Sequence, residues 1–155
     1  MLLTACKDMP DERKDAIVEM NFRSLRDIKC DNLFSYLSEW LAGLYDPDSR
    51  EVVVPGRGRI PVNEESVHRV MGVHRGGEDV PYNLPTEADY ELGEEMFGDL
   101  GYTPKMTDVL ELITNSVNHD DNFKRMWLML AGNTVIAPTT SNKVSPRWYG
   151  VLVST

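Results

Sequence analysis

Hydrophobic positions along the chain recur mostly at helical spacing. Between residues 33 and 44 they follow the 3.6-residue period of a helix that buries one stripe of its surface. The stripe consists of Leu33, Leu37, Trp40, Leu41 and Leu44. It predicts a helix that Asp31 or Asn32 caps and that ends before Asp46-Pro47, because a residue that precedes proline avoids helical geometry.

Residues 106–117 and 121–131 show the same period. The first stripe is Met106, Val109, Leu110, Ile113 and Val117, and the second is Phe123, Met126, Trp127 and Leu130. Leu128, Met129 and Ala131 make the second helix apolar on nearly every side, and Asp120 or Asp121 can cap it. Such a helix is buried on several sides, so we expect it at the centre of the core.

Residues 51–62 change to a strand pattern. Two short β-branched runs flank Pro55-Gly56-Arg57-Gly58, which is typical of a hairpin with a glycine-containing turn. Pro61 cannot donate a hydrogen bond to a neighbouring strand, so we expect its strand at an edge.

Two short helices are predicted from their start signals, and a third, charged helix is predicted from its apolar positions. Asn63 begins one that ends at Gly72, with Val67, Val70 and Met71 as its buried face. Thr86 with Asp89 resembles a capping box that begins the second. A charged segment, residues 11–27, has a thinner apolar face made of Ala16, Ile17, Met20 and Phe22.

The last predicted helix begins at Ser145-Pro146 and includes residues 147–153. The sequence stops within about two turns of that start. We therefore expect Trp148, Leu152 and Val153 to be exposed, the chain to be the amino-terminal part of a longer protein, and the fragment to fold poorly alone.

Together these elements predict a mainly α fold, a compact multi-helix domain with one short β-hairpin over about residues 51–62. The chain has 155 residues, which suits a single domain covering residues 1–155. Its 41% hydrophobic content fits a folded protein. Apolar runs are shorter than the roughly 18 residues of a membrane span, so we expect no membrane association.

Charge argues against nucleic acid as a partner. The 25 acidic and 16 basic residues give a net charge of −9, whereas affinity for nucleic acid comes largely from neutralising phosphates. Eight carboxylates and neither Lys nor Arg occur between Gly76 and Pro104. That stretch is either a solvated acidic surface or a docking surface for a basic partner.

No residue pattern indicates catalysis, a metal or a cofactor. The histidines His68, His74 and His119 do not have metal-binding spacing, and Cys30 has no neighbouring base to activate it. We therefore expect a protein that is not an enzyme.

Two blocks of sequence resemble a known family. The first includes Tyr45-Asp46-Pro47-Asp48, Gly56 to Asn63, Val67 to Val73 and Arg75-Gly76-Gly77; the second runs from Leu128 to Pro146. They are similar to the plant mobile domain, also labelled "aminotransferase-like, plant mobile domain", over most of residues 20–153. Aminotransferase chemistry needs a pyridoxal phosphate lysine in a large α/β domain, which this chain lacks, so we expect no cofactor.

The resemblance implies a transposon-related plant protein that is intracellular and nuclear, with a role in silencing or development. It implies no catalytic residues. Our leading hypothesis is a non-enzymatic protein-interaction domain with an unknown protein partner. Two alternatives stay open: a nucleic-acid-binding accessory domain of a transposase-like protein, and the recruiting region of a longer SUMO-protease-like cysteine peptidase.

Candidate binding residues lie around the hairpin and the glycine-rich loop: Arg57, Arg59, Arg69, Arg75, Gly76 and Gly77. Arginine offers forked donors to a carboxylate or phosphate, and paired glycines allow a close approach. The alternative is that these arginines are a solvated rim in which Arg69 pairs with Glu65, four residues before it.

Overall fold

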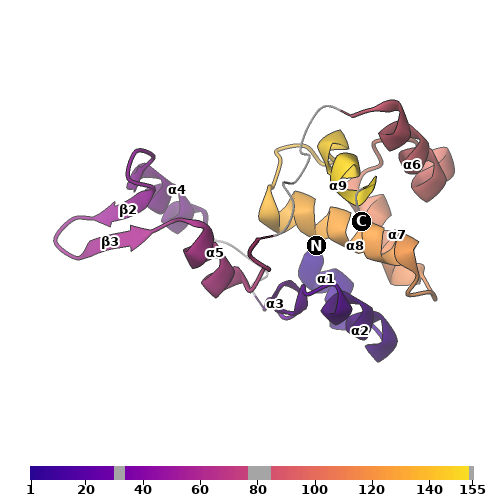
Figure 1. Ribbon diagram of the computed structural model, residues 1–155, viewed down its shortest axis with the longest axis horizontal. Helices are drawn as coiled ribbons and strands as arrows, with labels where there is room; N and C mark the ends of the chain where they lie inside the picture. The colour runs from indigo at the N-terminus through magenta and orange to yellow at the C-terminus, as the bar shows by residue number, and fades with distance from the viewer. Residues whose placement is uncertain (30–33, 77–84, 154–155) are drawn as a thin grey trace.

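The computed structural model describes residues 1–29, 34–76 and 85–153, which form a helical body and a projecting arm (Figure 1). We call residues 34–76 the arm. It contains α4 (Ser35–Gly43), β1 (Tyr45–Asp46), β2 (Glu51–Val54), β3 (Gly58–Pro61) and α5 (Glu64–Met71). The other described residues are the body. It contains α1 (Leu2–Lys7), α2 (Asp11–Glu19), α3 (Arg23–Arg26), α6 (Glu87–Phe97), α7 (Met106–Asn115), α8 (Asp121–Ala131) and α9 (Tyr149–Val153).

The predicted mainly α fold with a short hairpin is confirmed. The strands form one antiparallel sheet in the order β1-β2-β3, so Pro61 lies on an edge strand as expected. Gly56 and Gly58 have φ values of 70° and 118° in the hairpin turn, a region that glycine enters without strain. The short strand β1, which the sequence pattern did not predict, pairs with β2.

Helix α8 lies in the middle of the body, with α1, α2 and α3 on one side and α6 and α9 on the other (Figure 1). Its side chains Phe123, Trp127 and Leu130 are fully buried. This confirms the prediction that residues 121–131 form the centre of the core. α2 is tied to α7 through Arg13, whose buried guanidinium donates to the carbonyl of Ile113 at 2.7 Å.

Three predicted helix starts are confirmed by their hydrogen bonds. The Asn63 Oδ1 atom accepts from the Ser66 N–H at 2.9 Å, and the Asp120 Oδ1 atom accepts from the Phe123 N–H at 3.0 Å. At Thr86, the backbone N–H donates to the Asp89 carboxylate at 2.6 Å. Each cap satisfies backbone donors that the first turn of a helix leaves without an intrahelical partner.

Gly72 ends α5 in the left-handed conformation, with a φ of 62°, as predicted. A Cβ atom at this position would overlap the Ser24 side chain of α3. Met71 and Val73, on either side of Gly72, pack against the core of the body. The arm therefore contacts the body where α5 ends.

Two predicted helices differ in extent. Residues 11–27 form two helices, α2 and α3, because Asn21 has a φ of 64° and breaks the run. α7 ends at Asn115, so Val117 lies beyond it and is exposed, although its spacing had placed it on the buried stripe. Helix α1, which was not predicted, buries Leu2 and Cys6.

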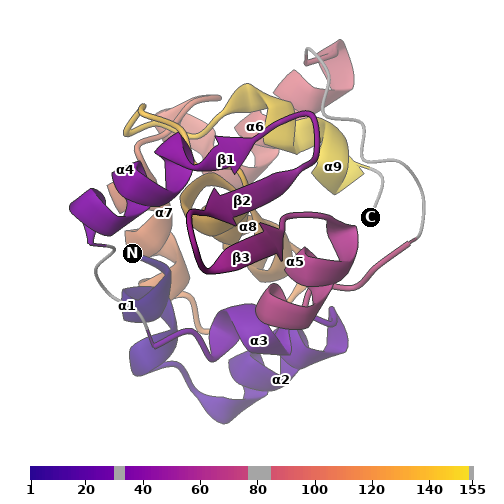
Figure 2. The same ribbon diagram turned by 90° about the vertical axis from the view of Figure 1, so that its left-hand side faces the viewer.

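Several side chains expected in the core are exposed. Leu37 and Trp40 of α4 and Val67 and Val70 of α5 were predicted to be buried, and all four are exposed. The reason is that α4 and α5 belong to the arm, which projects away from the body in Figure 1 and faces the viewer in Figure 2. Leu33, the first residue of the predicted stripe, lies outside the described residues.

The expected exposure at the carboxyl end is wrong for Trp148 and Leu152, which are buried. The Val153 side chain lies outside the described part of the chain. Helix α9 packs against α6, and its Tyr149 hydroxyl donates to the Tyr102 carbonyl at 2.7 Å. Trp148 and Leu152 thus belong to the core of the body, whereas the poor folding of the fragment stays a prediction.

We expect Gly132→Ala to destabilise the body. A Cβ atom at Gly132 would lie 2.5 Å from the Trp148 indole, and overpacking of this kind costs about 1–3 kcal/mol. Urea unfolding followed by far-ultraviolet circular dichroism measures the change. The control is Gly43→Ala at the end of α4, where a Cβ atom meets nothing within 4 Å. A Gly132→Ala protein as stable as wild type would contradict this packing.

We also expect the stability of the body to fall in alkaline solution. Burial raises the pKa of Tyr102 from 10 to about 12 and raises that of Tyr149 as well. The neutral phenols thus stabilise the fold fully below about pH 10, and this contribution is lost as the pH rises towards 12. Melting temperatures across this range should fall less steeply for Tyr149→Phe than for wild type. A Tyr149→Phe curve as steep as that of wild type would contradict this role of the buried phenols.

Candidate protein-interaction surface

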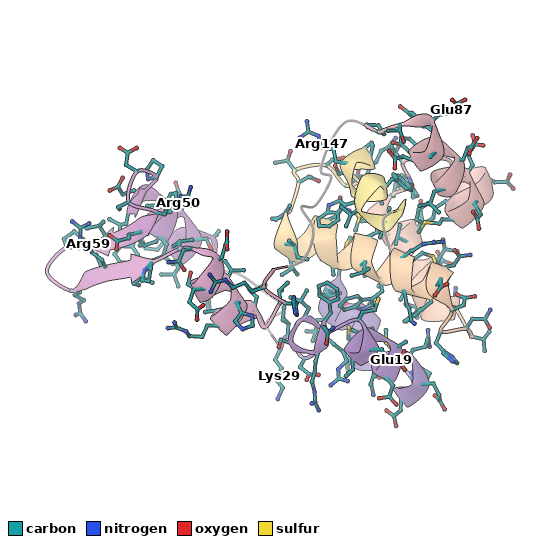
Figure 3. The ribbon with its side chains drawn as sticks, viewed as in Figure 1. Glu19, Lys29, Arg50, Arg59, Glu87 and Arg147 are labelled. Carbon is teal, nitrogen blue, oxygen red and sulfur yellow. The ribbon has the colours of Figure 1, made fainter. Side chains whose placement is uncertain are left out.

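The predicted arginines of the hairpin lie at the outer part of the arm. Arg57 is in the turn, where its backbone N–H donates to the Val54 carbonyl at 3.0 Å and its side chain is exposed. Arg59, labelled in Figure 3, lies on β3 and donates to the Glu51 carboxylate of β2 at 2.9 Å. That hydrogen bond and the negative charge of Glu51 raise the pKa of Arg59.

The other two arginines lie at α5 and share a glutamate. The Glu65 carboxylate is 2.6 Å from Nη1 of Arg75 and 3.6 Å from Nη2 of Arg69. Arg75 also approaches Glu64 at 3.8 Å. The alternative considered from the sequence, in which Arg69 pairs with Glu65, is thus present in the structure.

The glycines of the predicted site follow Arg75. Gly76 has a φ of 90°, which favours glycine, and Gly77 lies outside the described residues. The candidate residues therefore form two groups, one on the hairpin and one at α5, instead of a single cluster. Carboxylates lie beside Arg59, Arg69 and Arg75 and offset their positive charge locally.

A groove of about 400 Å³ lies between the end of β3 and α5. Val62, Val67 and Val73 contribute its apolar wall, and Arg50 and Arg75 lie on its rim. A hydrogen bond of 2.8 Å joins Nδ1 of His68 to the Val73 carbonyl, so the loop after α5 folds back onto that helix. The groove thus connects the apolar side of the hairpin with the apolar side of α5.

Exposed apolar side chains gather on the arm. Nine large ones lie there among the described residues: Phe34, Tyr36, Leu37, Trp40, Tyr45, Ile60, Val62, Val67 and Val70. Val52 is directly opposite both Tyr45 and Ile60, so these three side chains share one face of the sheet. None of the residues of α4 is buried, and this helix adds the exposed side chains of Tyr36, Leu37 and Trp40 to the arm. We call the nine side chains the arm surface.

Sequence reasoning missed most of the arm surface, but two signals were available. Tyr36 lies one turn before Trp40 and Phe34 directly precedes α4, so the apolar side of this helix is wider than the stripe of Leu37, Trp40 and Leu44. A hairpin with Ile60 and Val62 on one face also needs a covering element, because an isolated hairpin is at best marginally stable in water.

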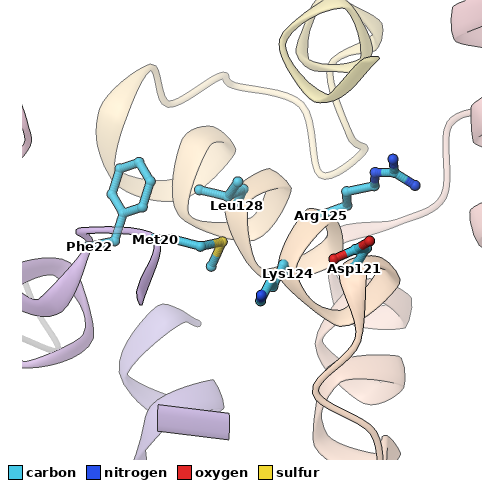
Figure 4. A pocket seen from close by; sticks show the side chains of 6 residues that line it. All are labelled: Met20, Phe22, Asp121, Lys124, Arg125 and Leu128. Atoms are coloured by element: carbon cyan, nitrogen blue, oxygen red, sulfur yellow. The ribbon is translucent and has the colours of Figure 1, made fainter. Parts of the chain in front are cut away.

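A second hollow, of about 340 Å³, lies on the body between the α2–α3 turn and α8 (Figure 4). Met20, Phe22 and Leu128 form its apolar part. The side chains of Lys124 and Arg125 point to opposite sides of it, and Lys124 lies 3.6 Å from Glu19. These cations therefore do not converge on a common ligand.

Among the described residues, Cys6 is a free and buried cysteine. Burial raises the pKa of the Cys6 thiol, which keeps it protonated and unreactive. Among the same residues, no three His, Cys, Asp or Glu side chains gather closely enough to hold a metal ion. Within the described part of the chain, no helix is both long and apolar enough to cross a bilayer.

The chain belongs to the family described as "Domain of unknown function (DUF8566)", whose model matches residues 1–155. Searches of curated proteins and of solved structures give no match.

We expect the double variant Arg69→Ala/Arg75→Ala to stay folded. Both arginines pair with Glu65 at exposed positions, and exposed ion pairs contribute about 0.2–1 kcal/mol each. Urea unfolding should show a loss of this size, and the loss should shrink in high salt. Unfolding of the double variant would mean that these pairs hold the arm together.

Proposed function

We propose that this chain is a non-enzymatic protein-interaction domain and that the arm surface is its binding site. The observation that carries the proposal is the exposure of nine large apolar side chains on one projecting part of the molecule. Exposed apolar patches larger than a few hundred Å² mark interaction sites in soluble proteins. Aromatic residues, which are enriched in binding hot spots, account for four of the nine.

The arm elements also need a covering partner for their own stability. α4 has nine residues, whereas isolated helices shorter than about 12–15 residues are marginal in water. Most helices are stabilised by packing an apolar face, and α4 has no buried residue. A protein seated on the arm surface supplies that packing.

The resemblance to the plant mobile domain supports a wider setting for this function. In that setting the chain acts in a transposon-related plant protein in the nucleus. The peptidase-recruiting alternative needs a further domain in the same protein. The nucleic-acid alternative is disfavoured by the net charge of −9 and by the carboxylates beside Arg59, Arg69 and Arg75.

A matched pair of valine variants tests the proposal. Val70 on the arm is 78% exposed and Val117 on the body is 93% exposed, so Val70→Glu and Val117→Glu make the same chemical change at two surface positions. Immobilised wild-type and Val117→Glu proteins should capture the same partners from a plant nuclear extract, identified by mass spectrometry. Val70→Glu should lose them, because a carboxylate is costly to bury in an apolar interface.

Equal capture by both variants would contradict the arm surface as the binding site. Electrophoretic mobility shifts of DNA and RNA at several salt concentrations test whether the chain binds nucleic acid instead of protein. A shift that weakens steeply with salt would indicate phosphate contacts and favour that alternative.

A further inference from the structure

We infer that the arm surface binds the arm surface of a second copy of this chain, giving a symmetric dimer. The inference rests on the proposed function and names the partner. Area, charge and the direction in which the arm projects support it independently.

The area of the arm surface suits a dimer. Nine large apolar side chains with these exposures present on the order of 1,000 Å², and each partner in a stable interface contributes about 800 Å². The surface combines one face of the sheet with α4 and with Val67 and Val70 of α5. A patch of this size is enough for an interface between two copies without a contribution from the body.

The charge of the arm favours a partner with the same arm. Residues 34–76 contain six acidic and five basic side chains, whereas the rest of the chain contains 19 acidic and 11 basic ones. A strongly basic partner would be attracted to the body more than to the nearly neutral arm, and a strongly acidic partner would be repelled by the chain as a whole. Another copy of the arm avoids both effects.

A two-fold interface requires a surface that complements itself. The arm pairs Arg59 with Glu51 and Arg75 with Glu65, so each copy presents both signs of charge beside the apolar side chains. Two antiparallel arms can bring the arginines of one copy near the glutamates of the other around an apolar centre. Such polar rims surround the apolar centre of most protein interfaces.

The projection of the arm removes the main obstacle to self-association. Each chain carries a net charge of −9, mostly in the body, and two bodies in contact would repel each other. Because the arm extends away from the body, arms that overlap side by side leave the bodies at opposite ends of the dimer (Figure 1). Salt screens charges over about 8 Å at physiological ionic strength, so separated bodies repel weakly.

Sedimentation equilibrium of the purified wild-type chain at several concentrations tests the inference. We expect a species of twice the 17.6 kDa chain mass that dissociates on dilution. A monomer at every concentration would overturn it. Hydrogen exchange of the same wild-type protein should show α4 and β3 better protected at high concentration than at low, a result that requires no variant.

Two matched pairs locate the interface. Val70→Glu is compared with Val117→Glu, and Ile60→Glu, at a position 53% exposed, with Ile136→Glu, at a position 43% exposed. The arm variant of each pair should raise the dissociation constant roughly tenfold or more, while the body variant leaves it unchanged. Equal effects within both pairs would overturn the inference. Val70→Thr, which keeps the side-chain shape, should show a smaller change in the same direction.

These results separate the inference from the proposed function. A monomeric chain whose capture of other proteins still depends on Val70 would overturn the dimer and leave the interaction domain standing. A monomeric chain with no arm-dependent capture would overturn both.

Discussion

The burial of α8 on more than one side is the constraint on which the body depends. Trp127 and Met129 point to nearly opposite sides of α8 and both are fully enclosed, so helices must cover α8 on opposite sides. The amino-terminal helices cover one side, and α6 with α9 cover the other. The packing is close at Gly132, because the Trp148 indole occupies the space that a Cβ atom at this position would need. Helix α9 is consequently part of the core, with its Tyr149 and Leu152 enclosed.

Local signals in the sequence predicted the start of each capped helix and the position of the hairpin. Asn63, Thr86 and Asp120 act on backbone atoms within three residues, so their role can be inferred without the fold. The nearly continuous apolar character of residues 121–131 likewise required a central position. Periodicity identified the apolar side of α5, but whether Val70 is covered depends on which elements pack there. Val70 is exposed because the arm leaves the body at Gly72, and no local sequence pattern predicts this arrangement.

The candidate site likewise combines contacts that local sequence predicts with contacts that only the fold creates. Helical spacing suggested the pair between Arg69 and Glu65, whereas Arg75 reaches Glu65 only because the loop after α5 turns back and is tied to His68. The arginines were candidates for their chemistry, yet a neighbouring carboxylate offsets the charge of three of them. The apolar side chains near them went unrecognised because a hydrophobic residue in a sequence is first assigned to the core.

The body and the arm therefore differ in whether their apolar residues are buried. The body encloses those of α7, α8 and α9, and acidic residues cover the outside of α6. The apolar residues of the arm are exposed, although short helices and small sheets depend strongly on packing for their stability. The apolar core around α8 is already enclosed by the other helices of the body, so it leaves no buried face for the arm. We propose that another molecule supplies the packing that the arm lacks, and this proposal ties the stability of the arm to its function.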